Sequence, residues 1–366
     1  MEITKEQVLK ALSYVDDPDL HQDLVTLNMV SDILIDGSNI SFTVILTTPA
    51  CPLKETIRQS CENAIHHLIS ADAKVTIRMD SDVTSRRKDN KKVLPGVKNI
   101  IAVASGKGGV GKSTVAVNLA IGLAKNNASV GLIDADIYGP SIPIMMDIKG
   151  QRPQVREIDG KHLMLPIEKF GIKVLSIGLL VDEKQAVVWR GPMVSSALRQ
   201  FVSECDWGEL DYLIVDLPPG TGDIHLTLVQ TVPVTGAIIV TTPQDVALAD
   251  AKKALGMFNI HPINVPILGI VENMAYFTPA ELPENKYYIF GKGGGQKLAE
   301  EFEAPLLGQI PIVQSIREGG DNGKPAVLSG ERISSEVFYN LAQSVAQHVA
   351  IRNANLESTK VVEIVN

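Results

Sequence analysis

One short segment of this 366-residue chain limits its fold more than any other. Gly106–Ser113 reads GKGGVGKS, which matches the pattern G-x-x-x-x-G-K-[ST]. An apolar run precedes it at Ile100–Ala104, and a helical segment follows it at Val115–Leu123. Glycines let such a loop point successive N–H groups at phosphate oxygens, and the helix N-terminus adds positive potential. The segment therefore predicts a nucleotide-binding P-loop, with Lys112 on the β- and γ-phosphates and the Ser113 hydroxyl on Mg²⁺.

The rest of the chain from about residue 99 alternates apolar strands with helical segments. The strand candidates, rich in β-branched residues, are Ile100–Ala104, Val130–Ile133, Ile172–Ile177, Tyr212–Val215, Ala237–Val240 and Ile267–Val271. Nearly continuous apolar runs of this kind suit parallel strands that are covered on both faces. We therefore expect an α/β fold, namely a P-loop NTPase with a mostly parallel, doubly wound sheet.

Acidic residues follow two of these predicted strands. Asp216 closes the apolar run before it, an arrangement that holds Mg²⁺ or its water, and Asp134 and Asp136 close the run at Val130–Ile133. In an open parallel sheet, ligands bind beyond the carboxyl ends of the strands. We therefore expect these carboxylates to lie beside the P-loop, although capping of a helix or turn remains an alternative for Asp134 and Asp136.

The first 80 residues predict a separate small α+β domain. Val8, Leu12 and Val15 recur at helical spacing, and apolar residues alternate on both sides of the turn at 36–39, which predicts a β-hairpin. We expect domains at 1–80 and 99–352, a basic flexible linker at 81–98 and a tail at 353–366. The linker carries Arg86, Arg87, Lys88, Lys91 and Lys92. A solvated linker is favoured over a nucleic-acid patch because no aromatic residues interleave these charges.

The charge balance excludes some kinds of partner. Asp and Glu number 42 against 34 Lys and Arg, for a net charge of −8. A general electrostatic attraction to nucleic acid or to an anionic membrane is therefore not expected. The N-terminus MEITKEQ has no apolar signal-peptide region, and no apolar run is long enough to span a membrane. We expect a cytoplasmic protein with neither nucleic acid nor membrane as a partner.

Three cysteines in a chain of this length do not form a disulfide framework. Cys61 and Cys205 continue apolar helical stripes and are expected in the core. Cys51 precedes Pro52, which suits a first helical position and would place Cys51 at the N-cap, where a thiolate is stabilised. Cys51 is therefore a candidate iron–sulfur or other metal ligand, and an inert cap residue is the alternative.

Several motifs together resemble a known family. Gly106–Thr114, GKGGVGKST, resembles the deviant Walker A motif of the MinD/ParA/nitrogenase-reductase class, which is marked by the additional Lys107. The predicted cradle comprises Gly106, Lys107, Gly108, Gly109, Val110, Gly111, Lys112, Ser113 and Thr114. The further motifs are Asp134–Ser141 (DADIYGPS), Trp189–Met193 (WRGPM), Asp216–Asp223 (DLPPGTGD), Glu272–Met274 (ENM) and Phe290–Gly295 (FGKGGG). With them, residues 99–350 resemble the Mrp/ApbC iron–sulfur carrier ATPases. Residues 1–80 resemble the iron–sulfur-assembly domain often fused upstream of them.

The resemblance implies a homodimer with ATP between its subunits. Lys107 would reach across to the nucleotide of the partner, and Asp136 would orient or activate the attacking water, with Asp134 nearby. Asn273 and Ile310–Val313 would lie near the adenine. The family carries a [4Fe–4S] cluster at the dimer interface and passes it to apo iron–sulfur proteins. The implied partners are therefore apo iron–sulfur proteins and assembly factors.

The chain departs from that family in one loop. Its members carry Cys-x-x-Cys after the Glu-Asn-Met segment, where this chain has Tyr276–Tyr287 without a cysteine. Thiolates are the usual ligands of iron–sulfur clusters. The alternatives are a cluster with unusual ligands, an assembly ATPase that does not hold the cluster, and a ParA/MinD-like positioning ATPase. Membrane docking of the last kind would need a basic amphipathic C-terminal helix, and Asn353–Asn366 has only Lys360 as a base.

Overall fold

The computed structural model describes residues 3–87, 93–137, 139–158, 160–180, 191–279, 281–282 and 284–362. The chain divides into two compact units. One unit comprises residues 1–84 with 346–356, and the other comprises residues 85–345 with 357–366. The last long helix, α10 (Arg332–Asn355), contributes residues to both units. The predicted domain borders remain predictions.

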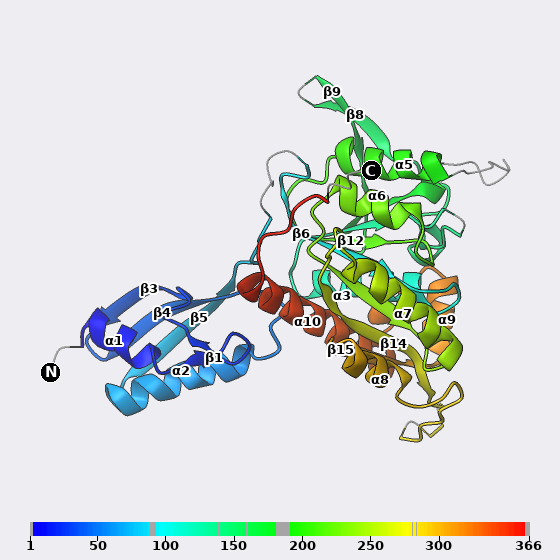
Figure 1. Ribbon diagram of the computed structural model, residues 1–366. Helices are drawn as coiled ribbons and strands as arrows, with labels where there is room; N and C mark the ends of the chain where they lie inside the picture. Colours follow the sequence, from blue (N-terminus) through cyan, green and yellow to red (C-terminus); the bar gives the residue numbers. More distant parts are fainter. Residues whose placement is uncertain are drawn as a thin grey trace. The chain divides into compact units, whose positions relative to one another are not determined.

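The larger unit is built on an eight-stranded sheet with the order β10-β11-β7-β12-β6-β13-β14-β15 (Figure 1). Its strands are β6 (Val97–Ala104), β7 (Val130–Asp134), β10 (Ile167–Lys169), β11 (Ile172–Ser176), β12 (Leu210–Asp216), β13 (Gly236–Thr241), β14 (Ile267–Phe277) and β15 (Leu306–Ile312). All pairs are parallel except β10 with β11. The predicted mostly parallel sheet is confirmed. Strand β15 was not among the predicted strands, because Gly308, Gln309 and Pro311 interrupt its apolar run.

Helices cover both faces of this sheet, as the doubly wound prediction requires (Figure 1). On one face lie α5 (Gly191–Ser203), α6 (Asp223–Thr231), α7 (Asp245–Asn259) and α8 (Gly294–Glu301). They share a hydrophobic core with alternate strand residues such as Ile100, Ala102 and Leu213. On the other face, α3 (Lys112–Lys125) packs against the central strands and against the first part of α10, where Gly122 faces Ala342. The middle of the sheet is therefore buried on both faces beneath the P-loop.

Shorter elements complete the larger unit. They are α4 (Ile142–Met145), α9 (Gln314–Asp321), the hairpin of β8 (Gln154–Ile158) with β9 (Lys161–Leu165), and two 3₁₀ turns at Ile177–Leu179 and Ala326–Leu328. The segment 181–190, with the first part of the predicted motif Trp189–Met193, lies outside the described residues, as does Tyr138 of the motif Asp134–Ser141. Among the described helices, none combines the length and apolar composition that a membrane span requires.

The smaller unit has the expected α+β composition. The sheet β3-β4-β5 consists of β3 (Val30–Asp36), β4 (Asn39–Leu46) and β5 (Lys74–Ser81), and the short pair β1 (Asp16–Asp17) with β2 (Gln22–Asp23) stands apart. The antiparallel β3–β4 pair confirms the predicted hairpin. Helices α1 (Lys5–Leu12) and α2 (Lys54–Leu68) pack on the sheet and form its core with Leu12, Phe42 and Ile57.

Arg87 corrects the prediction of a wholly solvated basic linker. Its side chain is buried, and its guanidinium donates to the backbone carbonyl oxygens of Val93, Leu94 and Val97. Burial lowers the pKa of Arg87 to about 10. The sequence does not reveal the burial of Arg87. The groups that accept its hydrogen bonds are backbone carbonyl oxygens, which any residue can supply. Lys88, Lys91 and Lys92 lie outside the described residues.

Candidate active site

The P-loop joins β6 to α3, and glycines set its shape. Gly109 and Gly111 both have φ of 81°, a region that glycine adopts without strain. A Cβ at Gly106 would lie 2.1 Å from the carbonyl carbon of Asp250 in α7, so the loop needs a glycine there. Because Gly111 has no side chain to cap α3, the first N–H groups of that helix remain open to an anion.

Lys112 is the centre of a buried ionic network. Its Nζ lies 2.7 Å from Asp216 Oδ1, and the two side chains are 6% and 0% exposed. Ser113 donates from Oγ to Asp216 Oδ2 at 2.5 Å. Burial raises the pKa of Asp216, while the charge and hydrogen bond of Lys112 act in the opposite direction. A hydroxyl and a carboxylate in contact are the hard oxygen donors that Mg²⁺ prefers, so these residues fit the predicted magnesium site.

Asp134 lies behind this network at the end of β7. It is fully buried and accepts hydrogen bonds from Ser176 Oγ at 2.7 Å and from the backbone N–H of Asp136 at 3.2 Å. Burial, followed by the neighbouring Asp216, raises the pKa of Asp134 to about 8. Loss of solvation therefore favours the neutral form of Asp134, and the hydrogen bond from Ser176 partly offsets this effect.

Asp136 is less deeply buried than Asp134. Its Oδ2 lies 3.7 Å from Lys112 Nζ, and its Oδ1 is buried without a hydrogen-bond partner among the described residues. Asp136 lines a cavity of about 190 Å³ together with the whole loop from Lys107 to Thr114. Asp136 therefore brings to the cavity wall a carboxylate with one oxygen that lacks a hydrogen-bond partner among the described residues, an unusual state for a buried acceptor.

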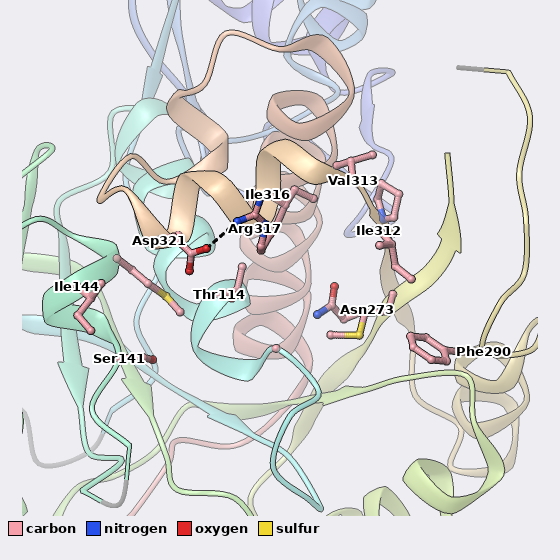
Figure 2. Close-up of a pocket in the computed structure, with 15 residues that line it drawn as sticks. Thr114, Ser141, Ile144, Asn273, Phe290, Ile312, Val313, Ile316, Arg317 and Asp321 are labelled. Carbon is pink, nitrogen blue, oxygen red and sulfur yellow. Dashed lines mark hydrogen bonds and ion pairs between the residues drawn. The ribbon is translucent and has the colours of Figure 1, made fainter. Parts of the chain in front are cut away.

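A second cavity, of about 530 Å³, opens beside the P-loop (Figure 2). It shares Gly111, Thr114, Ser141 and Met145 with the phosphate cavity, so the two cavities are adjacent. Asn273 lines it and also donates from Nδ2 to the carbonyl oxygen of Val110 at 2.8 Å. Asn273 therefore fixes the backbone of the P-loop as well as bordering the space next to it.

The structure brings Lys112, Ser113, Asp136 and Asp216 together as predicted, and places Lys107 at the rim of the same cavity. Sequence reasoning missed Ser176, which supports Asp134, and the charged pair Arg317–Asp321 of α9, which lines the larger cavity. Ser176 lies near the end of the predicted strand Ile172–Ile177, at the same edge of the sheet as Asp134, and that position was the available signal. The α9 pair has none, because no motif connects this surface helix with the P-loop.

Cys51 requires a correction. Helix α2 begins at Lys54 with Leu53 as its N-cap, so Cys51 precedes the cap instead of occupying it. Burial raises the pKa of Cys51, and the hydrogen bond from the backbone of Leu53 only partly opposes this effect. The predicted stabilisation of a thiolate is therefore wrong. Pro52 was expected to be the first residue of the helix. Pro52 and Leu53 instead form a turn, and the helix begins at Lys54.

The other two thiols are buried, as expected. Cys61 lies in the core of the smaller unit, and Cys205 lies in that of the larger unit. Burial raises the pKa of each to about 12. All three cysteines are free. Among the described residues, no group of three or more His, Cys, Asp and Glu side chains is arranged to hold a metal ion.

Aromatic and basic residues occupy the loop in which the family carries Cys-x-x-Cys. Tyr276 packs edge-on against Tyr288 with ring centroids 6.4 Å apart, and Lys286 Nζ lies 4.4 Å from the Tyr276 centroid. Two backbone hydrogen bonds join Phe277 and Tyr287. Ala280 and Pro283 of this loop lie outside the described residues. The loop is thus held by ring and cation contacts that provide no soft metal ligand.

Family models match both parts of the chain. The model described as NUBPL iron-transfer P-loop NTPase, of the ParA group, matches residues 96–348. A second model, described as iron–sulfur cluster assembly protein, matches residues 5–77.

Similar proteins cover nearly the whole chain. A Synechocystis protein named iron–sulfur cluster carrier protein is 48% identical over 351 residues, which cover 95% of this chain and 99% of that protein. An Escherichia coli K12 protein of the same name is 44% identical over 347 residues, with 94% and 92% covered.

Solved structures resemble the larger unit. A nucleotide-binding protein from Archaeoglobus fulgidus in complex with ADP is 38% identical with a TM-score of 0.58, covering 69% of this chain and 96% of its own. The Pyrococcus furiosus cell division ATPase MinD shares the fold at 22% identity and a TM-score of 0.50, covering 68% of this chain and 98% of its own. With these matches added to the P-loop geometry, the chain belongs to the family of NUBPL iron-transfer P-loop NTPases, with an iron–sulfur cluster assembly domain preceding the NTPase.

Proposed function

We propose that this protein hydrolyses ATP and uses the hydrolysis to handle iron–sulfur clusters on their way to apo-proteins. The observation that carries the nucleotide half is the buried contact of Lys112 and Ser113 with Asp216 at the open N-terminus of α3. The cluster half rests on the family and on the relatives named iron–sulfur cluster carrier proteins.

Each residue of the P-loop site has a physical role in hydrolysis. The N–H groups of Gly108–Ser113 bind phosphate oxygens, and Lys112 neutralises the charge that develops on the transferred phosphoryl group. Ser113 and Asp216 are the residues that would hold Mg²⁺, which would supply further positive charge beside the phosphates. Lys112 Nζ lies 2.7 Å from Asp216 Oδ1. The positive charge of Lys112 is therefore in position before the nucleotide binds.

Asp136 and Lys107 are assigned the remaining steps. Asp136, which lines the phosphate cavity, accepts a hydrogen bond from the attacking water and orients that water toward the γ-phosphate. Lys107 stands half-buried at the rim of the phosphate cavity. In a homodimer it reaches the nucleotide of the partner subunit and supplies positive charge there, as an arginine finger does.

The cluster is cargo, and this chain offers few ligands for it. A [4Fe–4S] cluster takes four thiolates as a rule, whereas Cys61 and Cys205 are buried thiols with pKa values of about 12. Cys51 is the half-buried thiol that remains. We therefore favour a carrier in which two Cys51 side chains hold the cluster weakly, with its other ligands supplied by the donor or acceptor protein.

The proposed partners follow from this role. They are a second copy of the chain, iron–sulfur assembly factors that donate clusters, and apo-proteins that accept them. Three free thiols without a disulfide fit a reducing compartment, so we place the protein in the cytoplasm.

The deciding experiment couples the two halves of the proposal. The protein is reconstituted anaerobically with iron and sulfide and mixed with an apo-enzyme that requires a [4Fe–4S] cluster, with ATP or without it. We expect the wild type to hydrolyse ATP and to activate the apo-enzyme faster than free iron and sulfide do, and the Lys112→Ala variant to do neither. Transfer by Lys112→Ala at the wild-type rate would separate the P-loop from the cargo function.

A further inference from the structure

The larger cavity beside the P-loop has the position and the lining to receive the nucleoside part of a nucleotide (Figure 2). It lies next to the phosphate cavity, and Gly111 and Thr114 line both. Much of its wall is apolar, with Ile144, Phe290 and Ile312 among the lining side chains. An apolar wall suits the faces of a purine, whereas a ribose needs hydrogen-bonding groups for its hydroxyls. Polar residues in this wall are therefore candidates for recognition of the sugar.

Arg317 and Asp321 bring charge into this wall from one turn of α9. Arg317 Nη1 lies 3.1 Å from Asp321 Oδ2, and Nη2 lies 3.0 Å from Glu318 Oε1. Figure 2 shows the Arg317–Asp321 pair on one side of Thr114, with Asn273 and Phe290 on the other side. The sugar of a nucleotide is attached to the phosphates that the P-loop would hold, so a bound nucleotide would bring it into the cavity that Thr114 and this pair line.

We propose that Asp321 is a specificity-determining residue that binds the ribose of the nucleotide. Its carboxylate accepts a hydrogen bond from a ribose hydroxyl, the contact by which carboxylates recognise this sugar in other nucleotide sites. The ion pair uses Oδ2, so Oδ1 can accept the hydroxyl while Arg317 keeps the carboxylate oriented toward the cavity. Arg317 is a positioning residue. The inference rests on the proposed nucleotide function and adds that the site selects ribonucleotides over deoxyribonucleotides.

Glu318 provides a matched control on the same helix. It also pairs with Arg317, at 3.0 Å, but it does not line the cavity. Removing its charge therefore changes the electrostatics of α9 without removing a ligand of the sugar. Asp321 and Arg317 are both 64% exposed, so substitution at either position is not expected to unfold the protein.

The experiment measures binding of Mg-ADP, 2′-deoxy-ADP and 3′-deoxy-ADP by calorimetry, which avoids hydrolysis. We expect the wild type to bind ADP about tenfold more tightly than at least one deoxy analogue, the effect of one hydrogen bond to a charged group. In Asp321→Ala the preference disappears because ADP binding weakens, while binding of that analogue is unchanged. Glu318→Gln retains the preference. Asp321→Asn, which keeps size and one acceptor, falls between the wild type and Asp321→Ala.

Two results would overturn the assignment. One is equal binding of ADP and both analogues by the wild type, and the other is an undiminished preference in Asp321→Ala with the protein folded by circular dichroism. Both leave nucleotide binding itself intact. Absence of binding for all three nucleotides would instead reject the proposed nucleotide function, and this inference with it.

Discussion

The P-loop site and the cysteines both remove ionisable side chains from water, with opposite consequences. At the P-loop, Lys112 and Asp216 are buried as a pair, and each charge has a partner within 2.7 Å. Cys61 and Cys205 are buried among apolar side chains, and the pKa of each thiol is raised to about 12. Burial alone does not prepare a group for reaction. The partner decides whether the charged form survives.

The comparison separates what this chain does itself from what its partners must supply. The phosphate site is assembled from this chain before any ligand binds, whereas no comparable set of thiolates is assembled for the cargo among the described residues. The following predictions test the two sides of that contrast, beginning with the paired charges.

Lys112→Ala should have the largest effect. It removes the main cation of the phosphate site and leaves Asp216 buried without its partner. The variant is therefore expected to lose both nucleotide binding and stabilisation of the transition state. We expect kcat/KM for ATP hydrolysis, measured by phosphate release, to fall at least about 1000-fold. Lys125→Ala, at the exposed end of the same helix, is the control and should retain activity. Turnover within tenfold of the wild type in Lys112→Ala would show that the paired charge of Lys112 is not needed for hydrolysis.

Lys107→Ala should reduce turnover by about 100-fold or more while nucleotide binding stays near that of the wild type, because its charge acts on the nucleotide of the partner. The test mixes Lys107→Ala with Lys112→Ala. In a mixed dimer, the Lys112→Ala subunit supplies an intact Lys107 to the intact P-loop of the other subunit. We expect the mixture to hydrolyse ATP faster than the sum of the separate variants. No gain on mixing would assign Lys107 to its own subunit.

Asp136→Asn should slow hydrolysis by about 100-fold and leave ATP binding intact. The amide keeps the size of the side chain but cannot attract the proton of the attacking water as a carboxylate does. The single-turnover rate and the dissociation constant for ATP separate the two effects. If ATP binding fails as severely as in Lys112→Ala, Asp136 has a structural role, since its Oδ2 also faces Lys112 at 3.7 Å.

The sequence predicted the sheet and the P-loop site because both depend on local signals. Continuous β-branched runs identified the inner strands, and the position of Asp216 at a strand end placed it beside Lys112. The parts it missed depend on tertiary contacts. Asp321 lines the larger cavity because α9 packs against α4, and Arg87 is buried against backbone carbonyl groups, which leave no signature in the sequence. Cys51 was misjudged because a two-residue turn delays α2 and because burial outweighs the effect of the helix end.

Cys51→Ala tests the thiol side of the contrast. We expect the reconstituted wild type to bind less than one cluster per dimer, in a labile form, and the variant to lose most of that iron. ATPase activity should stay within about twofold, because Cys51 and the P-loop belong to different units. Iron and sulfide analysis with Mössbauer spectra measures the loss, and Cys205→Ala is the control. A stable cluster in Cys51→Ala would mean that its ligands are not the thiols favoured here.

His225 extends the comparison to a group that is buried without any ionic partner. It lies in the first turn of α6, is 2% exposed, and packs edge-on against Phe258 with ring centroids 6.3 Å apart. Among the described residues, neither of its ring nitrogens has a hydrogen-bond partner. Burial is the main cause that lowers the pKa of His225 to about 4 from a reference value of 6.5, so the folded protein holds the neutral ring.

The sign of the resulting pH dependence follows from these two values. Below pH 6.5 the unfolded chain binds a proton at this position that the folded chain does not bind, so the free energy of unfolding falls as the pH drops toward 4. Between pH 7.5 and pH 5 the loss from His225 is about 2 kcal/mol. His225→Gln should remove this part of the acid sensitivity in urea unfolding, while His162→Gln, on an exposed strand position, should not. An equal loss in His225→Gln and the wild type would show that the ring takes up its proton inside the fold, and that burial without a partner does not hold it neutral.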